Sequence, residues 1–235
     1  MGQPNYFWDE KRSIPNHETI LAGCRSPMQP AHTGVRRQPG FFLGGMRVDP
    51  ESRDNSSRTP LSYAAGVCKG VGVVELLLER GEVDPESRDN SGRTPLSYAA
   101  TYGREGTAKL LLEREEVNPE SRGSSGRTPL SYAASEHGSE EIVKLLLERD
   151  EVDPESRDDS GRTPLSHAAG AYKGEGAVKL LLEREEVNSE SRDNFGRTPL
   201  SYAAGTFWGE GAAHLLLERE ERRFWLNPAR LDYRS

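Results

Sequence analysis

Short apolar stretches alternate with long polar connectors along this chain, and they do so at a regular spacing. The stretch Arg-Thr-Pro-Leu-Ser-Tyr-Ala-Ala begins at Arg58, Arg93, Arg127 and Arg197, and a variant with histidine for tyrosine begins at Arg162. The threonines follow one another at intervals of 35, 34, 35 and 35 residues, and each block precedes a second stretch ending in Leu-Leu-Leu-Glu-Arg. Such self-similarity predicts a stacked repeat array, because no single unit can bury its own apolar face.

The first stretch of each unit predicts a short helix. In the first unit, Thr59 is a good N-cap and Pro60 occupies the first helical position, where its missing N–H has no consequence. At about 100° per residue, Leu61 shares one face with the two alanines of the motif, while Tyr63 points nearly opposite. The small alanines allow neighbouring helices to approach closely.

The second stretch predicts another helix, with a wide apolar face. In the first unit, Val73, Leu76 and Leu77 form a stripe that Val74 and Leu78 widen. A face of this width suits a helix that packs against its partner and against both neighbouring units. The sequence therefore predicts two helices per unit.

The connectors between units are rich in Pro, Asp, Asn, Ser and Gly, as in residues 83–92. These residues specify turns, so each connector is expected to project as a finger. A glycine that gives the backbone freedom just before each first helix recurs at Gly92, Gly126, Gly161 and Gly196. Ser57 replaces that glycine in the first unit.

The pattern Asp-x-x-Gly-x-Thr-Pro-Leu-x-x-Ala-Ala, followed by a Leu-Leu-Leu helix and a Val-Asn or Val-Asp finger, resembles the ankyrin repeat over roughly 41–221. The repeated sequence is similar to that of ankyrin arrays in filamentous fungi. Those arrays often follow nucleotide-binding or other signalling domains. The resemblance implies an all-α ankyrin-repeat solenoid of stacked helix-turn-helix units with projecting finger loops, used for protein–protein recognition.

The chain departs from the family pattern at two positions, one in all five units and one in four of them. Serine replaces the usual histidine after Thr-Pro-Leu, so the inter-unit hydrogen bonds of that histidine are not expected. The usual glycine after the second helix survives only as Gly81, and the other units carry Glu115, Asp150, Glu185 and Glu220. Each replacement costs about 1 kcal/mol if it must adopt a left-handed cap.

This reading divides the chain into an array with two flanking segments. We expect a disordered or poorly specified leader at 1–40, a degenerate half repeat at 41–53, repeats at 54–88, 89–122, 123–157 and 158–192, an incomplete repeat at 193–221, and a tail or partial cap at 222–235. Phe224, Trp225 and Leu226 either fold over the last apolar face or mark a truncated array. Exposed array ends would allow self-association.

Charge and composition limit the classes of partner and the cellular location that we expect. The chain carries −7, and its basic ends leave about −12 on residues 41–221, so this acidic surface is not expected to bind nucleic acid. We expect no membrane span, because no apolar run approaches about 18 residues. The absence of a signal-peptide stretch and of a disulfide framework, with Cys24 and Cys68 alone, favours an intracellular location, cytoplasmic or nuclear.

No catalytic residue, metal site or cofactor site is predicted. The histidines lie in different units without metal-ligand spacing, at His17, His32, His137, His167 and His214. The segment Gly174-Glu175-Gly176 lacks the Gly-Lys-Ser/Thr ending of a phosphate-binding loop. An enzyme is therefore not expected.

Two surfaces are candidates for binding another protein. One is a ladder on the first helices, with one ring per unit: Tyr63, Tyr98, Tyr132, His167 and Tyr202. Its rings are either exposed contacts or packed against the finger or the next helix. The other surface is the turn after the first helix, with the aromatic residues Tyr102, Tyr172, Phe207 and Trp208. Its variation between units reflects either partner selection or drift after duplication.

The sequence thus predicts a non-enzymatic protein–protein interaction module that binds an unknown partner through its concave helix and finger surface. The alternative is a regulatory or sensor array separated from a nucleotide-binding or other signalling domain.

Overall fold

The computed structural model describes residues 49–135 and 139–226, with side chains as far as Arg222. All of them belong to one compact unit, Val48–Ser235. The predicted leader at 1–40, residues 41–48 of the half repeat and residues 227–235 of the predicted tail lie outside the described residues.

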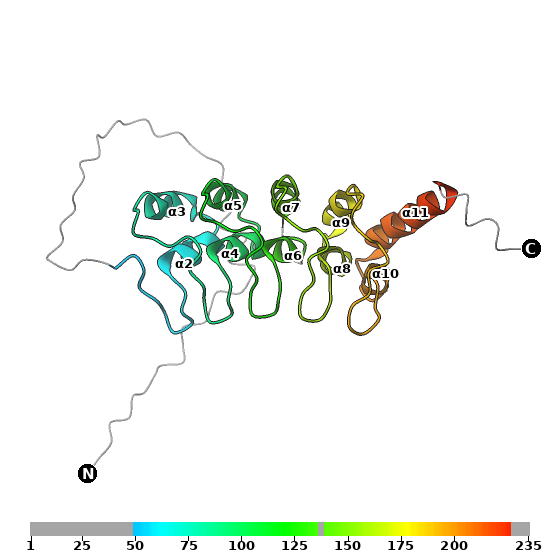
Figure 1. Ribbon diagram of the computed structural model, residues 1–235, viewed down its shortest axis with the longest axis horizontal. Coiled ribbons are helices and arrows are strands. Elements are labelled where there is room, and N and C mark those ends of the chain that lie inside the picture. Colours follow the sequence, from blue (N-terminus) through cyan, green and yellow to red (C-terminus); the bar gives the residue numbers. More distant parts are fainter. Residues whose placement is uncertain (1–48, 136–138, 227–235) are drawn as a thin grey trace, which may run out of the picture. The chain divides into compact units, whose positions relative to one another are not determined.

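Ten helices and no strands form in the described residues, so the predicted all-α class is confirmed. The first helices of the five units are α2 (Pro60–Gly66), α4 (Pro95–Thr101), α6 (Pro129–Ala133), α8 (Pro164–Ala169) and α10 (Pro199–Ala204). The second helices are α3 (Val71–Leu78), α5 (Glu105–Leu112), α7 (Glu140–Leu147), α9 (Glu175–Leu182) and α11 (Glu210–Leu226). Figure 1 shows first and second helices in two layers, with the finger loops projecting beyond the first helices.

Each first helix begins as the motif predicts. Thr59 is the N-cap of α2 in extended conformation, and its hydroxyl oxygen accepts a hydrogen bond from the Ser62 N–H at 3.2 Å, with Pro60 at the start of the helix. The same threonine cap and proline occur at α4, α6, α8 and α10. The five helices therefore start at equivalent positions, which keeps the units in register.

The core lies between the two helix layers. Leu61 and Ala65 of α2 are fully buried, as predicted. The predicted centre of the α3 stripe is wrong, because Val73 and Leu76 are half exposed while Val74 is fully buried. An apolar run of five residues does not fix which of its members faces the first helix. That choice depends on how the two helices pack.

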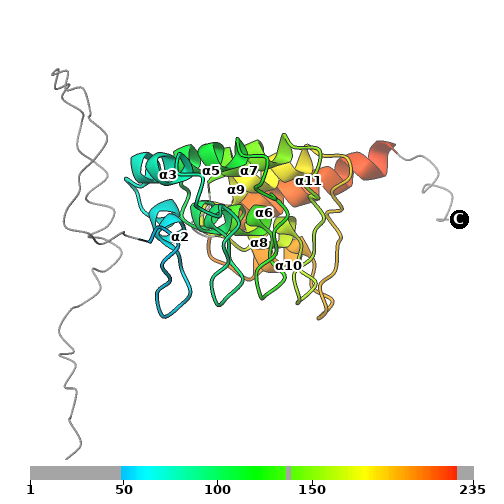
Figure 2. The same cartoon turned by 60° about the vertical axis from the view of Figure 1, so that its left-hand side comes forward.

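The fingers are joined by a ladder of arginine side chains. The Arg88 Nη1 donates to the Gly92 carbonyl of its own finger at 3.1 Å and to the Arg122 carbonyl of the next at 2.7 Å. Arg53, Arg122 and Arg157 make the same pair of bonds. Figure 2 shows the resulting fingers projecting on the same side of the helices.

Glutamate and serine side chains add a second set of links between fingers. The Glu51 carboxylate accepts the Asp84 N–H of the next finger at 3.0 Å, and later units repeat this contact. The buried hydroxyls of Thr59 and Ser87 lie 3.0 Å apart. The glutamate side chains thus connect neighbouring units although the family histidine is missing.

The expected strain after the second helix does not arise. Within the described residues, the non-glycine positions with positive φ are Ser57 and Lys173, so Glu115, Asp150 and Glu185 avoid the left-handed region. Glu220 lies inside α11. Residues 219–226 lack Gly and Pro and consist mainly of good helix formers, so α11 continues across the predicted boundary at 221 to Leu226.

The helices in the described part of the chain do not combine the length and apolar character that crossing a membrane requires.

We expect Ser57→Gly to raise the free energy of unfolding by about 1 kcal/mol, since Ser57 has φ 59° where the equivalent residues are glycines with φ of 68–78°. Urea unfolding monitored by circular dichroism measures this change. The reverse substitution Gly196→Ser is the control: it has the same backbone conformation and no atom within 4 Å of an added Cβ. A loss of similar size is expected there, and equal stability of all three proteins would contradict the prediction.

Candidate functional site

The predicted ladder of exposed rings is wrong for its inner members. Tyr98 and Tyr132 are 4% and 8% exposed, and the His167 side chain is 7% exposed. Tyr202 is partly buried, and Tyr63 alone among the five is largely exposed, at 58%. The alternative expectation, that the rings pack against a finger, describes the inner units correctly.

Each buried ring belongs to a polar clamp at the base of a finger. In the second unit, the Asp89 Oδ1 accepts the N–H groups of Ser91 and Arg93, both at 2.8 Å. Its Oδ2 accepts the Tyr98 hydroxyl at 2.6 Å and pairs with the Arg93 guanidinium at 3.3 Å. The Arg93 guanidinium also lies 4.5 Å from the centre of the Tyr98 ring. One carboxylate thus fixes the finger, the arginine and the first helix together.

The clamp recurs with small changes. Asp54, Asp158 and Asp193 accept the equivalent backbone N–H groups and arginine side chains. Tyr202 donates to Asp193 at 2.6 Å, as Tyr98 does to Asp89. The exposed Tyr63 contacts Arg58 through its ring, 4.8 Å from the guanidinium.

The clamp shifts the pKa of both partners. Burial raises the pKa of Asp89, but hydrogen bonds from Tyr98 and Arg93 outweigh it, so the net pKa is lowered. Burial and the hydrogen bond to Asp89 raise the pKa of Tyr98 to about 12. The carboxylate therefore stays ionised and the phenol stays protonated over the ordinary pH range.

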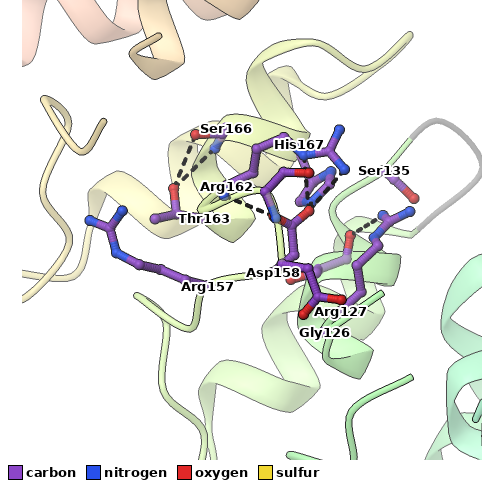
Figure 3. Close-up of polar contacts among 12 residues, drawn as sticks. Gly126, Arg127, Ser135, Arg157, Asp158, Arg162, Thr163, Ser166 and His167 are labelled. Carbon is purple, nitrogen blue, oxygen red and sulfur yellow. Dashed lines mark hydrogen bonds and ion pairs between the residues drawn. The ribbon is translucent and has the colours of Figure 1, made fainter. Parts of the chain in front are cut away.

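His167 takes the tyrosine position in the fourth unit (Figure 3). Its Nε2 lies 3.1 Å from the Asp158 Oδ2. Burial lowers the pKa of His167 to about 4, and the positive charges of Arg127 and Arg162 act in the same direction. The ring is therefore neutral near pH 7, and its Nε2–H donates to the Asp158 carboxylate.

The third unit lacks the carboxylate, because Gly123 stands at the aspartate position. The Arg127 Nη2 donates to the Ser131 carbonyl at 2.8 Å, and its guanidinium lies 4.4 Å from the centre of the Tyr132 ring. Its Nε is buried without a hydrogen-bond partner among the residues that the structure describes, and burial lowers the pKa of Arg127. This arginine is held by weaker contacts than its four equivalents.

Three of the four predicted turn aromatics lie together. The Tyr172 and Trp208 rings meet edge to face with centres 5.1 Å apart, and the Phe207 ring is 6.3 Å from Trp208. These side chains are 49%, 53% and 98% exposed, respectively. Tyr102, 43% exposed, lies apart from them in the second unit and stacks on Tyr98. The name aromatic turn cluster is used below for Tyr172, Phe207 and Trp208.

The described residues contain no group of three or more His, Cys, Asp or Glu side chains placed to hold a metal ion. The His214 Nδ1 makes a surface contact with the Glu218 carboxylate at 3.4 Å.

Sequence reasoning missed the aspartates and arginines of the clamp. Their signal was nevertheless present: an aspartate is followed by an arginine after four residues and by the tyrosine or histidine after nine, in every unit but the third. It missed the finger ladder too, although the triplet Glu-Ser-Arg recurs in every finger.

A family model described as ankyrin repeats, in three copies, matches residues 41–122, 68–158 and 150–223. The three matches together extend over most of the chain. The comparison with curated proteins gives no match.

We expect Tyr98→Phe to lower the free energy of unfolding by about 1.5–3 kcal/mol, because the buried Asp89 carboxylate loses its phenol donor. The matched control is Tyr63→Phe, whose hydroxyl forms no hydrogen bond within the described part of the chain, and it should change stability by less than about 0.5 kcal/mol. Urea unfolding of both variants measures the difference. Equal effects would show that the clamp does not stabilise the fold.

His167 should make stability depend on pH. Its pKa is about 4 in the folded chain, against an ordinary 6.5, so the stabilisation is complete above pH 6.5 and declines as the pH falls towards 4. We expect a loss of order 1–3 kcal/mol over this range. The same measurement is made on His167→Tyr, which keeps the titrating carboxylates. The difference between the two proteins therefore isolates the contribution of His167. A difference in unfolding free energy between the two proteins that stays constant from pH 7 to 4.5 would contradict the prediction.

Proposed function

The chain belongs to the ankyrin repeat family, and on this premise we propose that it is a non-enzymatic protein–protein interaction module. Ankyrin repeats generally serve as such modules, and the matched segments run from residue 41 to residue 223. The proposed partner is another protein, bound by side chains that the stacking of the units leaves exposed.

The aromatic turn cluster is the observation that carries this proposal. Large aromatic side chains dominate binding energy at protein interfaces, because each buries a wide area and loses little conformational entropy. Phe207 is 98% exposed, and Trp208 and Tyr172 are about half exposed, so folding does not use much of their surface. Their mutual edge contacts hold the rings in a defined arrangement before any partner arrives.

The turn that carries Tyr172 is also unusual in its backbone. Lys173 has φ 84°, a conformation that non-glycine residues rarely adopt, and its ammonium lies 5.6 Å from the centre of the Tyr172 ring. Strain of this kind persists where the surrounding structure requires it, and it is common at functional surfaces. It supports the turn as a place under functional constraint.

The tyrosine positions of the first helices are less suitable for binding a partner than the sequence suggested. Tyr98 and Tyr132 are buried, and Tyr98 already donates its hydroxyl to Asp89. The proposed partner therefore contacts the turns, with Tyr102 as a separate contact in the second unit, rather than a continuous ladder along the concave helix and finger surface.

The test compares two proteins that differ from the wild type at exposed aromatics. We expect the double variant Phe207→Ser, Trp208→Ser to lose a protein that the wild type retains in affinity capture from native lysate. Phe195→Ser is the matched control, since Phe195 is 74% exposed but lies in a finger, away from the turns. It should retain the same protein. Circular dichroism and thermal unfolding establish that all three proteins are equally folded.

A photoreactive phenylalanine analogue at position 207 makes the result direct. It should cross-link to the captured protein, and the same analogue at position 195 should not. Equal capture by the double variant and the wild type would reject the aromatic turn cluster as the binding surface.

A further inference from the structure

We propose that the third unit contains a binding site, with its donors already in place, for a carboxylate group of another molecule. The site consists of the backbone N–H groups of Ser125 and Arg127, the Arg127 guanidinium and the Tyr132 hydroxyl. It stands apart from the aromatic turn cluster and does not rest on the function proposed for it.

The other four units show what this set of donors binds. In each, one aspartate oxygen accepts two backbone N–H groups at 2.8–2.9 Å. The second oxygen pairs with the arginine of the same unit at 2.7–3.3 Å. Where a tyrosine hydroxyl joins, in the second and fifth units, it donates to that second oxygen at 2.6 Å. The same molecule thus demonstrates four times that these donors hold a carboxylate.

The donors are retained in the third unit although the carboxylate is not. Gly123 replaces the aspartate, yet the finger base keeps its shape: the Gly123 N–H donates to the Arg127 carbonyl at 3.0 Å and the Gly126 N–H to the Gly123 carbonyl at 2.9 Å. The equivalent bonds at Asp89 and Gly92 are 3.1 and 2.9 Å. Equal backbone geometry directs the N–H groups of Ser125 and Arg127 to the place where a carboxylate oxygen lies in the other units.

These donors have no acceptor in the described part of the chain. No hydrogen bond involves the N–H of Ser125 or Arg127 or the Tyr132 hydroxyl there, and the buried Arg127 Nε has no partner. The buried Arg127 Nε is a donor without an acceptor, which is destabilising, and an incoming carboxylate would satisfy it together with the two backbone N–H groups and the Tyr132 hydroxyl.

Charge favours the same ligand. The arginines of the other four units each form an ion pair with the aspartate of their own unit. The nearest acidic group of the next unit, Asp158, is already held by Arg162 and His167 (Figure 3). Among the described residues Arg127 is therefore a half-buried positive charge without an ion pair, in a chain whose net charge is −7. A charge in this setting attracts an anion more strongly than one in open solvent does.

Size and shape select a carboxylate among anions. A Cβ added at Gly123 would lie 2.8 Å from the Tyr132 hydroxyl and 3.3 Å from the Ser91 carbonyl oxygen, so the Tyr132 hydroxyl has to move aside for a carboxylate and a small ligand is favoured. The clamp also divides its donors between two oxygens in one plane, the N–H groups on one and the arginine on the other. A planar carboxylate matches this division of the donors and is smaller than a tetrahedral phosphate. The carboxylate can come from a small free acid or from an acidic side chain of a protein.

The experiment is a titration of the ¹⁵N-labelled protein, followed by the amide signals in heteronuclear correlation spectra. Sodium acetate is added against sodium chloride at matched ionic strength. We expect saturable shifts of the Ser125 and Arg127 amides. The amides of Ser91 and Arg93 already donate to the Asp89 carboxylate, so they are internal controls. Their signals should not shift.

The variant Gly123→Asp supplies the carboxylate within the chain. It should abolish the acetate response and raise the thermal midpoint by about 2–4 °C, provided that the Tyr132 hydroxyl moves aside. Should this variant fail to fold, the titration of the wild type still decides the question. Shifts at Ser125 and Arg127 no larger than those at Ser91 and Arg93 would overturn the proposal.

A second arm distinguishes the source of the carboxylate. The blocked peptide acetyl-Gly-Asp-Gly-amide is titrated in place of acetate. Tighter binding of the peptide, at the same two amides, supports an acidic side chain of a protein as the ligand. Tighter binding of acetate supports a small free acid. Binding of neither overturns the proposal.

Discussion

Each unit of this array depends on its neighbours for burial. A pair of helices of five to eight residues cannot cover its own leucines, and the fully buried side chains Leu96, Leu130 and Leu165 are enclosed because adjacent units stack. Stacking in turn requires a constant spacing between units. The fingers provide it, since one arginine in each of the first four binds the carbonyls of two successive fingers. Burial of apolar surface drives the assembly, and the finger ladder fixes its register.

The polar clamp connects this ladder to the core. An aspartate at the finger base holds two backbone N–H groups, an arginine and, in the second and fifth units, a tyrosine from the first helix. Because the aspartate is buried in the second, fourth and fifth units, each donor that binds it there also lowers the free energy of keeping a charge out of water. The tyrosine is therefore used in folding, which explains why it recurs in the motif without forming an exposed surface.

The departures from the repeated pattern are where individual properties arise. His167 introduces an imidazole whose pKa is lowered to about 4, and Gly123 removes a carboxylate while its donors remain. Phe207 and Trp208 place rings on a turn that needs none for packing. In an array of nearly identical units, a residue that differs from its equivalents is informative. The other units show which contacts the usual residue makes at that position.

The sequence by itself determined the period, the helix starts and the class of fold. Threonine caps, proline at the first helical position and leucine triplets act locally, so the boundaries of α2, α4, α6, α8 and α10 followed from the motif. It also identified the turn aromatics as exposed candidates, because their variation between units is visible without coordinates.

Only the tertiary structure decided which side of each helix faces the finger. The helical period placed Tyr98 opposite Leu96 and suggested solvent, but the finger of the same unit folds back over that side and buries the ring. The apolar stripe of α3 was misplaced for the same kind of reason, since packing partners and not the period select its buried members. Local patterns specify helices, whereas contacts between a helix and a loop nine residues earlier exist only once the chain has folded.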